Sequence, residues 1–184
     1  EITCNTINAG VYVLEPSVLG YMPKGENYSF ERGLFPTLLE KKELVMSYVL
    51  DKYWIDIGTP QKYLEVHHDI LAGRFLSSRV PKGSLDRSAL LGDVSIDDQS
   101  IIDGGVTIRS GVQIRNSVIG RNCKIEEGVH IVDSVIWAGN TLDAEAHVEG
   151  AILGKGCYVG RSAVVRPGAV LGDKTVVTDF RSEE

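Results

Sequence analysis

Aliphatic residues recur at a nearly constant spacing through the second half of the chain. From Leu91 onward they stand six residues apart, and the interval shortens to five at three places. A helix would require apolar positions every three to four residues, so a period near six favours short strands joined by tight turns. The recurring positions are Ile96, Ile102, Ile108, Ile114, Ile119, Ile125, Ile131, Ile136, Leu142, Val148, Leu153, Val159, Val165, Leu171 and Val177.

Two intervals of six and one of five make a coil of 17 residues, and RNSVIGRNCKI, VDSVIWAGNTL and EGAILGKGCYV align at that spacing. The pattern therefore predicts coils with three flat faces, stacked about 4.8 Å apart as neighbouring strands are. The residue four places after each aliphatic position is small or medium-sized and is expected to point inward beside it. These residues are Val106, Val112, Cys123, Val129, Asn140, Ala146, Cys157, Ala163, Ala169 and Thr175.

The first half of the chain has the alternating pattern of longer strands. INAGVYVL, residues 7–14, predicts one strand. ELVMSYVL, residues 43–50, and KYWIDIG, residues 52–58, predict a hairpin that turns at Asp51. Few strands are left to cover the helices in this half, so we do not expect it to be a complete domain.

Two helical segments also have start and stop signals in this half. Ser29 is expected to cap a short helix through FERGLF, and Pro36 to restart a turn at TLLEKK. A longer helix should have Thr59 as its N-cap, Pro60 at its first position and Gly73 at its end. Its apolar stripe is Tyr63, Val66, Ile70 and Leu71.

The motif YWIDIGTP, residues 53–60, places a carboxylate inside an otherwise apolar strand pattern. Alternation puts Asp56 beside Trp54 on one face of a segment that we expect to be buried. Burying an ionised carboxylate without a partner is costly, so Asp56 should have a compensating group.

The composition narrows the class of protein. A chain of 184 residues with 43% hydrophobic residues and a net charge of −6 is typical of a soluble, mildly acidic globular protein. Lys and Arg are scattered and no apolar run reaches about 18 residues, so neither nucleic acid nor a membrane is expected as a partner. Three cysteines without CxxC spacing and no visible signal peptide predict a cytoplasmic protein. Because the chain begins at Glu1 and enters a strand pattern almost directly, we expect it to be part of something longer.

Several stretches resemble known families. IGRNCK, VGRSAV and LGDKTV follow the [LIV]-G-x-x-x-x pattern of left-handed parallel β-helices built from hexapeptide repeats. The handedness comes from this resemblance, because parallel crossovers are normally right-handed. NAGVYVLEP, SFERGLFPTLLE and YWIDIGTPQKYLEVHHDIL, in that order before the repeats, closely resemble the C-terminal half of sugar-phosphate nucleotidyltransferases. The mannose-1-phosphate guanylyltransferases are the nearest branch, and glucose-1-phosphate adenylyl- and thymidylyltransferases are the alternative.

The resemblance implies a two-part fold. Residues 1–75 would be the C-terminal portion, an α+β remnant, of a Rossmann-like α/β nucleotidyltransferase domain. Residues 76–90 would be a linker, and residues 91–184 an all-β left-handed β-helix. The open ends and flat faces of such a β-helix favour self-association, so a homo-oligomer is expected.

The resemblance also implies an activity. Family members join a nucleoside triphosphate to a sugar 1-phosphate and release pyrophosphate, with Mg²⁺ as cofactor; GDP-mannose is the expected product here. Asp56 would be a ligand of the metal, Asn8 would contact the sugar hydroxyls, and Gly10 would permit close approach. The family's second metal carboxylate, its Gly-rich nucleotide loop and its sugar-binding Glu-Lys pair have no counterpart in this chain. No complete catalytic set is therefore expected, and the chain as given should be inactive by itself.

Other residues leave alternatives open. His130 and His147 are one coil apart and should stack outward on one face, and acyltransferases with this β-helix use a histidine, so an acetyl-CoA-dependent reaction is a second hypothesis. No long loop interrupts the coils to build an acceptor pocket for it. A third hypothesis is a non-enzymatic β-helix module for assembly or regulation.

The remaining candidates have structural explanations. His67 and His68 are adjacent on a helix and do not converge on one ion. Cys123 and Cys157 are two coils apart, beyond disulfide reach, and are expected in the core. For Glu31 we favour a plain stabilising role near a helix N-terminus. Trp137 should lie outside the coils, where it could mark an interface.

Overall fold

The computed structural model describes residues 6–74 and 92–183, and the chain divides into two compact units, Glu1–Trp54 and Ile55–Glu184. The predicted linker at 76–90 and Cys4 lie outside the described residues. The predicted domain limits therefore stay a prediction.

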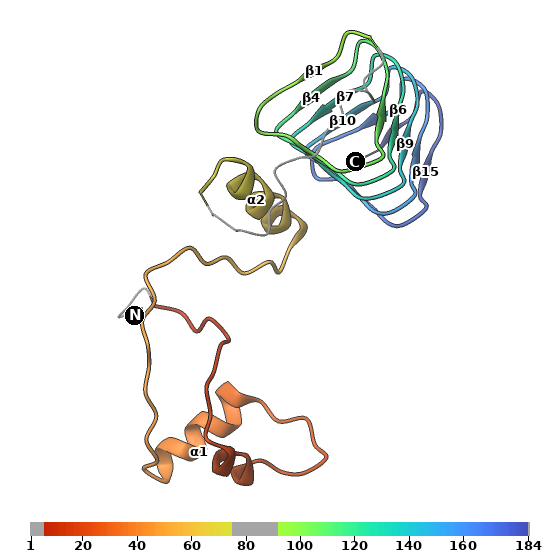
Figure 1. Ribbon diagram of the computed structural model, residues 1–184. Coiled ribbons are helices and arrows are strands. Elements are labelled where there is room, and N and C mark those ends of the chain that lie inside the picture. Colours follow the sequence, from red (N-terminus) through yellow and green to blue (C-terminus); the bar gives the residue numbers. More distant parts are fainter. Residues whose placement is uncertain (1–5, 75–91, 184) are drawn as a thin grey trace. The chain divides into compact units, whose positions relative to one another are not determined.

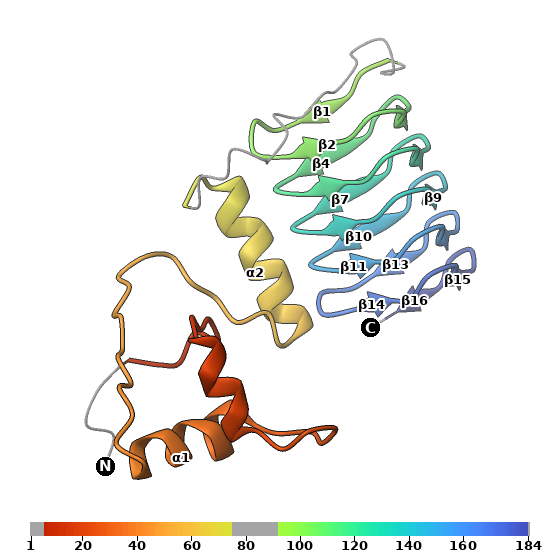
Figure 2. The same ribbon diagram turned by 60° about the horizontal axis from the view of Figure 1, so that its bottom comes forward.

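Residues 92–183 form a solenoid of short parallel strands, which Figure 1 and Figure 2 show as stacked three-sided coils. One sheet has the order β1-β4-β7-β10-β13-β16, the second β14-β11-β8-β5-β2 and the third β15-β12-β9-β6-β3. We call these the first, second and third faces of the β-helix. The strands are β1 (Ser95–Ile96), β2 (Ile101–Ile102), β3 (Thr107–Ile108), β4 (Gln113–Arg115), β5 (Val118–Ile119), β6 (Lys124–Ile125), β7 (His130–Val132), β8 (Val135–Ile136), β9 (Thr141–Leu142), β10 (His147–Glu149), β11 (Ile152–Leu153), β12 (Tyr158–Val159), β13 (Val164–Val165), β14 (Val170–Leu171), β15 (Val176–Val177) and β16 (Ser182–Glu183).

The strand register confirms the predicted coil. Ile114 pairs with Ile131 and Ile131 with Val148, a step of 17 residues. At the N-terminal coil Ile96 pairs with Ile114, a step of 18. The shorter coils turn between the first and second faces with one residue fewer. The residue at each of these turns has a positive φ: Asn116 at 45°, Asp133 at 51° and Gly150 at 55°.

The core of the β-helix is the predicted column of aliphatic residues. Ile108, Ile114 and Ile131 are fully buried, and only the end positions Ile96 and Leu171 are partly exposed. The predicted smaller inward residues are buried as well, with the exception of Thr175, which is half-buried. Each large aliphatic side chain contributes about 1.5–3 kcal/mol on burial.

Buried polar residues continue the ladder between coils. Ser134 donates its backbone N–H to Ser117 Oγ (3.1 Å), and Ala151 donates its N–H to Ser134 Oγ (3.2 Å). Asn140 donates from Nδ2 to the carbonyls of Trp137 and Gly154 and accepts the N–H of Cys157 at 2.8 Å. Each serine hydroxyl makes two hydrogen bonds and the Asn140 amide makes three, so their burial leaves no unsatisfied group.

The second face of the β-helix differs from the other two on its outside. Its outward strand positions are all aliphatic, and Val135 (3% exposed) and Ile152 (8% exposed) are buried although they point away from the core. Helix α2 (Pro60–Leu71) lies against this face, because Tyr63 and His67 line the same groove as Val135. The outward residues of this face are Ile101, Val118, Val135, Ile152 and Val170.

Helix α2 forms as the sequence predicts. The side chain of Thr59 accepts the N–H of Lys62 at 3.2 Å, Pro60 occupies the first turn, and Gly73 follows the helix with φ +71°. The predicted N-cap, first residue and terminator are therefore confirmed.

The first unit has three short helical segments: η1 (Pro16–Tyr21), a 3₁₀-helix; η2 (Phe30–Leu34), a π-helix; and α1 (Phe35–Glu40). Ser29 Oγ accepts the N–H of Arg32 at 3.2 Å, so the predicted cap is confirmed. Leu34 and Leu38 are buried, and the rings of Tyr12 and Phe35 pack edge to face with centroids 5.0 Å apart.

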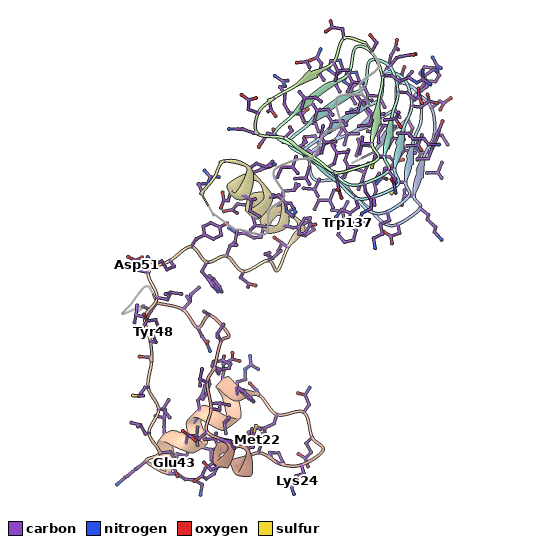
Figure 3. The ribbon with its side chains drawn as sticks, viewed as in Figure 1. Met22, Lys24, Glu43, Tyr48, Asp51 and Trp137 are labelled. Carbon is purple, nitrogen blue, oxygen red and sulfur yellow. The ribbon has the colours of Figure 1, made fainter. Side chains whose placement is uncertain are left out.

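The strands predicted at residues 7–14, 43–50 and 52–58 are wrong. The described residues of all three segments belong to no sheet, and the first segment bends at Gly10. Alternation is still visible, since Tyr12 and Leu14 are half-buried while Val13 is 99% exposed. A strand needs a hydrogen-bonded neighbour, and an isolated two-stranded hairpin is at best marginal in water. Figure 3 shows Tyr48 and Asp51 on such an extended segment.

Among the described residues, none of the helices combines the length and the apolar character that crossing a bilayer requires.

A substitution in the core column tests the register. Ile125 is 1% exposed, so Ile125→Ala should lower the free energy of unfolding by about 2–5 kcal/mol in urea titrations. Ile125→Asp should abolish the cooperative transition, because it buries an unpaired charge. The neighbouring outward residue provides the control, since Lys124→Ala should change stability by less than about 0.5 kcal/mol. A normal melt for Ile125→Asp would contradict the register.

Candidate functional site

A cluster of three polar side chains surrounds the predicted sugar-contacting residue. Asn8 donates from Nδ2 to Tyr12 Oη (2.7 Å) and to Glu31 Oε1 (3.3 Å), and Tyr12 Oη donates to the same carboxylate oxygen at 2.9 Å. Asn8 Oδ1 accepts the N–H of Gly10 at 2.9 Å, which closes an Asx turn. We call Asn8, Tyr12 and Glu31 the polar cluster.

The turn explains why glycine occupies position 10. Gly10 has φ +70°, a conformation in which side chains are strained, and a Cβ there would meet no atom within 4 Å. Position 10 therefore requires glycine because of its backbone conformation, and not because described residues pack closely against it. Close approach of a ligand, as the sequence suggested, stays a prediction.

The side-chain donors of the polar cluster are used within it, so oxygen acceptors are what it presents at the surface. Asn8 and Glu31 are exposed and Tyr12 is half-buried. Partial burial raises the pKa of Tyr12, the hydrogen bond from Asn8 opposes that change, and the hydrogen bond and charge of Glu31 add to it. The remaining lone pairs of the amide, phenol and carboxylate oxygens can accept hydrogen bonds from sugar hydroxyls.

Glu31 and Tyr12 extend what the sequence predicts. Glu31 does lie in the first turn of η2, as expected, but its carboxylate also fixes Asn8. Tyr12 has the same strand parity as Asn8, four residues earlier, and that alternation was the signal that it faces the same side. The contact to Glu31 had no such signal, because 23 residues separate it from Asn8.

Asp56 does not lie where the sequence predicts. The residue is exposed, as are its neighbours Trp54 (45%) and Ile57 (51%), because no strand covers this segment. Asp56 makes no hydrogen bond or ion pair with the described residues, so no compensating group is needed. Its Oδ2 lies 3.7 Å from the position of a Cβ built on Gly58, so the carboxylate lies close to the backbone two residues later.

The surroundings of Asp56 are compatible with Mg²⁺. The described residues contain no group of three His, Cys, Asp or Glu side chains placed to hold a metal ion. Magnesium in phosphoryl-transfer sites is commonly held by one or two carboxylates together with substrate phosphates and water. An exposed, unpaired carboxylate such as Asp56 fits the role of one such ligand.

The histidine pair lies on the first face, as predicted. The rings of His130 and His147 are stacked, with centroids 4.7 Å apart and an angle of 18° between planes. Neither imidazole has a hydrogen-bond partner among the described residues. A general base is normally oriented by a third group, and this pair has none there.

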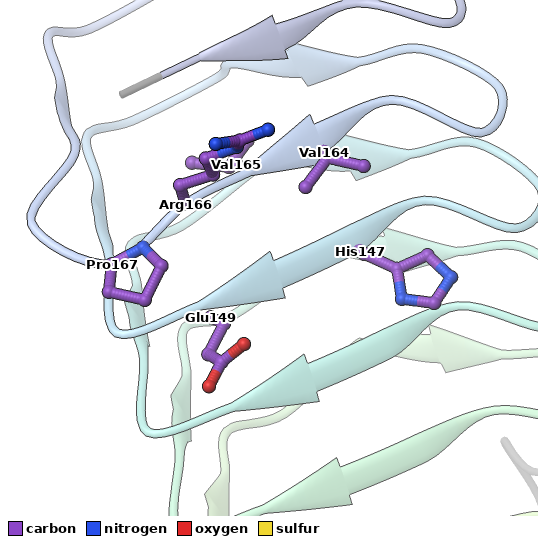
Figure 4. A pocket seen from close by; sticks show the side chains of 6 residues that line it. All are labelled: His147, Glu149, Val164, Val165, Arg166 and Pro167. Atoms are coloured by element: carbon purple, nitrogen blue, oxygen red, sulfur yellow. The ribbon is translucent and has the colours of Figure 1, made fainter.

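A shallow hollow adjoins the pair. It measures about 250 Å³ and lies between the strands that carry His147, Glu149 and Arg166, and Figure 4 shows these side chains spread over an open surface. The coils from Gly92 to Glu183 stay in register without a long insertion. The geometry therefore gives the acyltransferase hypothesis no acceptor pocket in the described residues.

The two described cysteines are structural. Cys123 and Cys157 are free, buried thiols that donate to the carbonyls of Trp137 and Gly172, each at 3.1 Å. Burial raises the pKa of both thiols. A protonated, buried thiol is a poor nucleophile, which confirms their assignment to the core.

Two family models match the chain. The model described as nucleotidyl transferase covers residues 2–73, and the model described as EIF2B subunit epsilon LbH domain covers residues 85–181, more than half of the chain. The first contains both Asn8 and Asp56, and the second contains the coils of the β-helix.

Curated relatives span both parts. A probable mannose-1-phosphate guanylyltransferase 2 of Arabidopsis thaliana is 31% identical over 96% of this chain and 51% of its own length. A mannose-1-phosphate guanyltransferase of Pichia angusta is 35% identical over 96% of this chain and 52% of its own length. A UTP–glucose-1-phosphate uridylyltransferase of Synechocystis sp. is 27% identical over 98% of this chain and 49% of its own length. The chain thus spans about half the length of the curated relatives it matches.

The stacked histidines should make stability depend on pH. Partial burial, and then the charges of His147 and Arg115, lower the pKa of His130 below its ordinary value. The folded state therefore disfavours the protonated ring, and the stability that the neutral ring supports is present above about pH 6.5 and lost as pH falls through the lowered pKa. The melting temperature should drop between pH 7.5 and pH 5.5.

The variant His130→Gln should show a smaller drop over the same pH range, because it removes the titrating ring. His67→Gln, on helix α2, provides the matched control and should keep the wild-type drop. Equal drops in wild type and His130→Gln, measured by thermal melts followed by circular dichroism, would contradict the assignment.

Proposed function

The chain belongs to the sugar-phosphate nucleotidyltransferases that have a C-terminal left-handed β-helix of hexapeptide repeats, and we propose on this premise that the full-length protein makes a nucleotide sugar. It would join a nucleoside triphosphate to a sugar 1-phosphate. The observation that carries the proposal is the sequence similarity of both parts at once, with Asn8 and Asp56 inside the matched nucleotidyl transferase region.

Mannose 1-phosphate and GTP are the substrates we favour, with GDP-mannose as the product. Support comes from the guanylyltransferases of Arabidopsis thaliana and Pichia angusta among the relatives. The uridylyltransferase of Synechocystis sp. favours glucose 1-phosphate and UTP as the second candidate.

The chemistry is a single displacement at phosphorus. A phosphate oxygen of the sugar 1-phosphate attacks the α-phosphorus of the triphosphate and forms the new P–O bond. The bond from that phosphorus to the bridging oxygen of the β-phosphate breaks, and pyrophosphate leaves with the electron pair. Both reactants are anionic, so charge neutralisation and alignment limit the rate.

Asp56 would act as one carboxylate ligand of the Mg²⁺ ion. A bound Mg²⁺ supplies charge neutralisation and alignment of the two phosphates. Asp56 is suited to this role because its carboxylate is exposed and has no partner among the described residues. The Asx turn and Gly10 would present Asn8, and the polar cluster would orient it toward the sugar hydroxyls.

The β-helix would serve assembly, and we expect a homo-oligomer. Its flat faces and its outward aliphatic residues at the C-terminal coil, Val170 (52% exposed) and Val176 (63%), support this role. The free thiols of Cys123 and Cys157 agree with a reducing compartment, the cytoplasm. The alternative is a scaffold protein without enzymatic activity. Assays with sugar 1-phosphates and triphosphates distinguish an enzyme from such a scaffold.

Replacing Asp56 tests the metal assignment. Asp56→Asn in the full-length protein should reduce kcat/KM by about a hundredfold or more, because a metal ligand stabilises the transition state by several kcal/mol. Asp51→Asn removes an exposed carboxylate of the same extended segment and should leave turnover unchanged. Pyrophosphate release over a panel of sugar 1-phosphates and triphosphates measures both. Wild-type turnover of Asp56→Asn would contradict the assignment.

Replacing Asn8 tests the sugar contact separately. Asn8→Ala should raise KM for the sugar 1-phosphate about two- to tenfold, the effect of losing one or two neutral hydrogen bonds, and leave KM for the triphosphate unchanged. Asn27→Ala, at another exposed loop position, is the control. If both KM values rise together for Asn8→Ala, the residue shapes the fold of the unit rather than the sugar site.

A further inference from the structure

Trp137 links helix α2 to the β-helix across a long separation in sequence. Its Nε1–H donates to Tyr63 Oη at 3.1 Å, and the two residues are 74 positions apart in the sequence. The indole is 40% exposed on the second face, where Figure 3 labels it. Lys155 Nζ lies 5.7 Å from the centroid of the same ring. The indole is thus held by a hydrogen bond on its edge and a cation at its face.

The contact continues along one side of α2. The rings of Tyr63 and His67 are 4.3 Å apart, and His67 Nδ1 lies 2.8 Å from the carbonyl of Tyr63. Both side chains line a groove of about 560 Å³ together with Val118, Val135 and Trp137. A hydrogen bond that is bordered by apolar side chains constrains the rotation of the helix more than apolar contact alone would, because only one register satisfies it.

Asp56 is joined to this helix by a short segment, since only Ile57 and Gly58 stand between it and the N-cap. It precedes the N-cap Thr59 by three residues, and Thr59 Oγ1 accepts the N–H of Lys62. Pro60 fixes its own φ at the start of the helix. The position of the first turn of α2 therefore limits the region that the carboxylate of Asp56 can reach.

We propose that Trp137 is a positioning residue for Asp56, which acts by fixing helix α2 through Tyr63. The β-helix would then serve as a rigid support for the metal-binding segment, in addition to any role in assembly. The part of the proposal that concerns the metal rests on the proposed function, because it takes Asp56 as a metal ligand.

The chain of 184 residues permits a direct test that does not depend on enzymatic activity. Trp137→Phe keeps an aromatic ring but removes the donor, and Tyr63→Phe removes the acceptor. In either variant the backbone amides of Lys62 and Tyr63, which are bonded to Thr59 in the first turn of α2, should exchange with deuterium about two- to tenfold faster, the effect of losing one hydrogen bond.

The matched control is Tyr158→Phe. It removes a phenol that donates to Asp143 Oδ2 at 2.9 Å, within the β-helix and outside the groove. In Tyr158→Phe the backbone amides of the first turn of α2 should exchange at the wild-type rate. Unchanged exchange in both Trp137→Phe and Tyr63→Phe would overturn the proposal.

The full-length protein provides the second readout, with Mg²⁺ alone as the titrated ion. Trp137→Phe should raise the Mg²⁺ concentration for half-maximal turnover about two- to tenfold, while KM for the sugar 1-phosphate and the melting temperature stay at wild-type values. A change in KM for the sugar with no change in the Mg²⁺ requirement would overturn the positioning role.

The two levels of inference fail differently. If wild type transfers no nucleotide at all, the proposed function is wrong, and the exchange rates alone decide whether Trp137 fixes the Asp56 segment. If wild type is active and Trp137→Phe matches it in both exchange and Mg²⁺ dependence, the proposed function stands and the positioning role is wrong.

Discussion

The hydrogen bonds between successive coils are the constraint on which the rest of the β-helix depends. Each strand is only two or three residues long, so no single strand pair is stable, and stability comes from repeating the pairing over three faces. Repetition in register requires that Ile114, Ile131 and Val148 stack directly. The inward aliphatic residues stack on one another from coil to coil. The buried side chains of Ser117, Ser134 and Asn140 also join successive coils, through hydrogen bonds.

Helix α2 shows how a closed solenoid can hold a neighbouring element. The outside of a β-helix face is ordinarily polar, and a helix could bury little apolar surface against such a face. Here the second face has aliphatic residues inside and outside, and Val135 and Ile152 are buried on the outer side. The hydrogen bond between Trp137 and Tyr63 is directional, whereas the apolar contact is not. The bond therefore fixes the position of the helix on the face as well as holding it there.

Sequence reasoning was sufficient for the elements whose signals are local or periodic. The 17-residue coil followed from spacing, and the cap at Thr59 from the Thr-Pro pair that precedes an apolar stripe. It failed for residues 7–14 and 43–58, because alternation predicts a strand only where a neighbour can pair with it. The Tyr63–Trp137 and Asn8–Glu31 contacts could not be predicted, since each joins residues far apart in sequence. The doublets Val118-Ile119 and Val135-Ile136 are the signal in the sequence for the covered face, because both the inward and the outward residue are aliphatic.

The place of Trp137 in the repeat also limits how the chain can change in length. A coil is a module, and gaining or losing one C-terminal to Leu171 would leave every pairing before it intact. Deleting the coil that contains Trp137 would instead bring Leu153 and Gly154 opposite α2, with no indole to meet Tyr63. Length variation among natural relatives should therefore concentrate beyond the coils that face α2, while the number of coils before them stays constant.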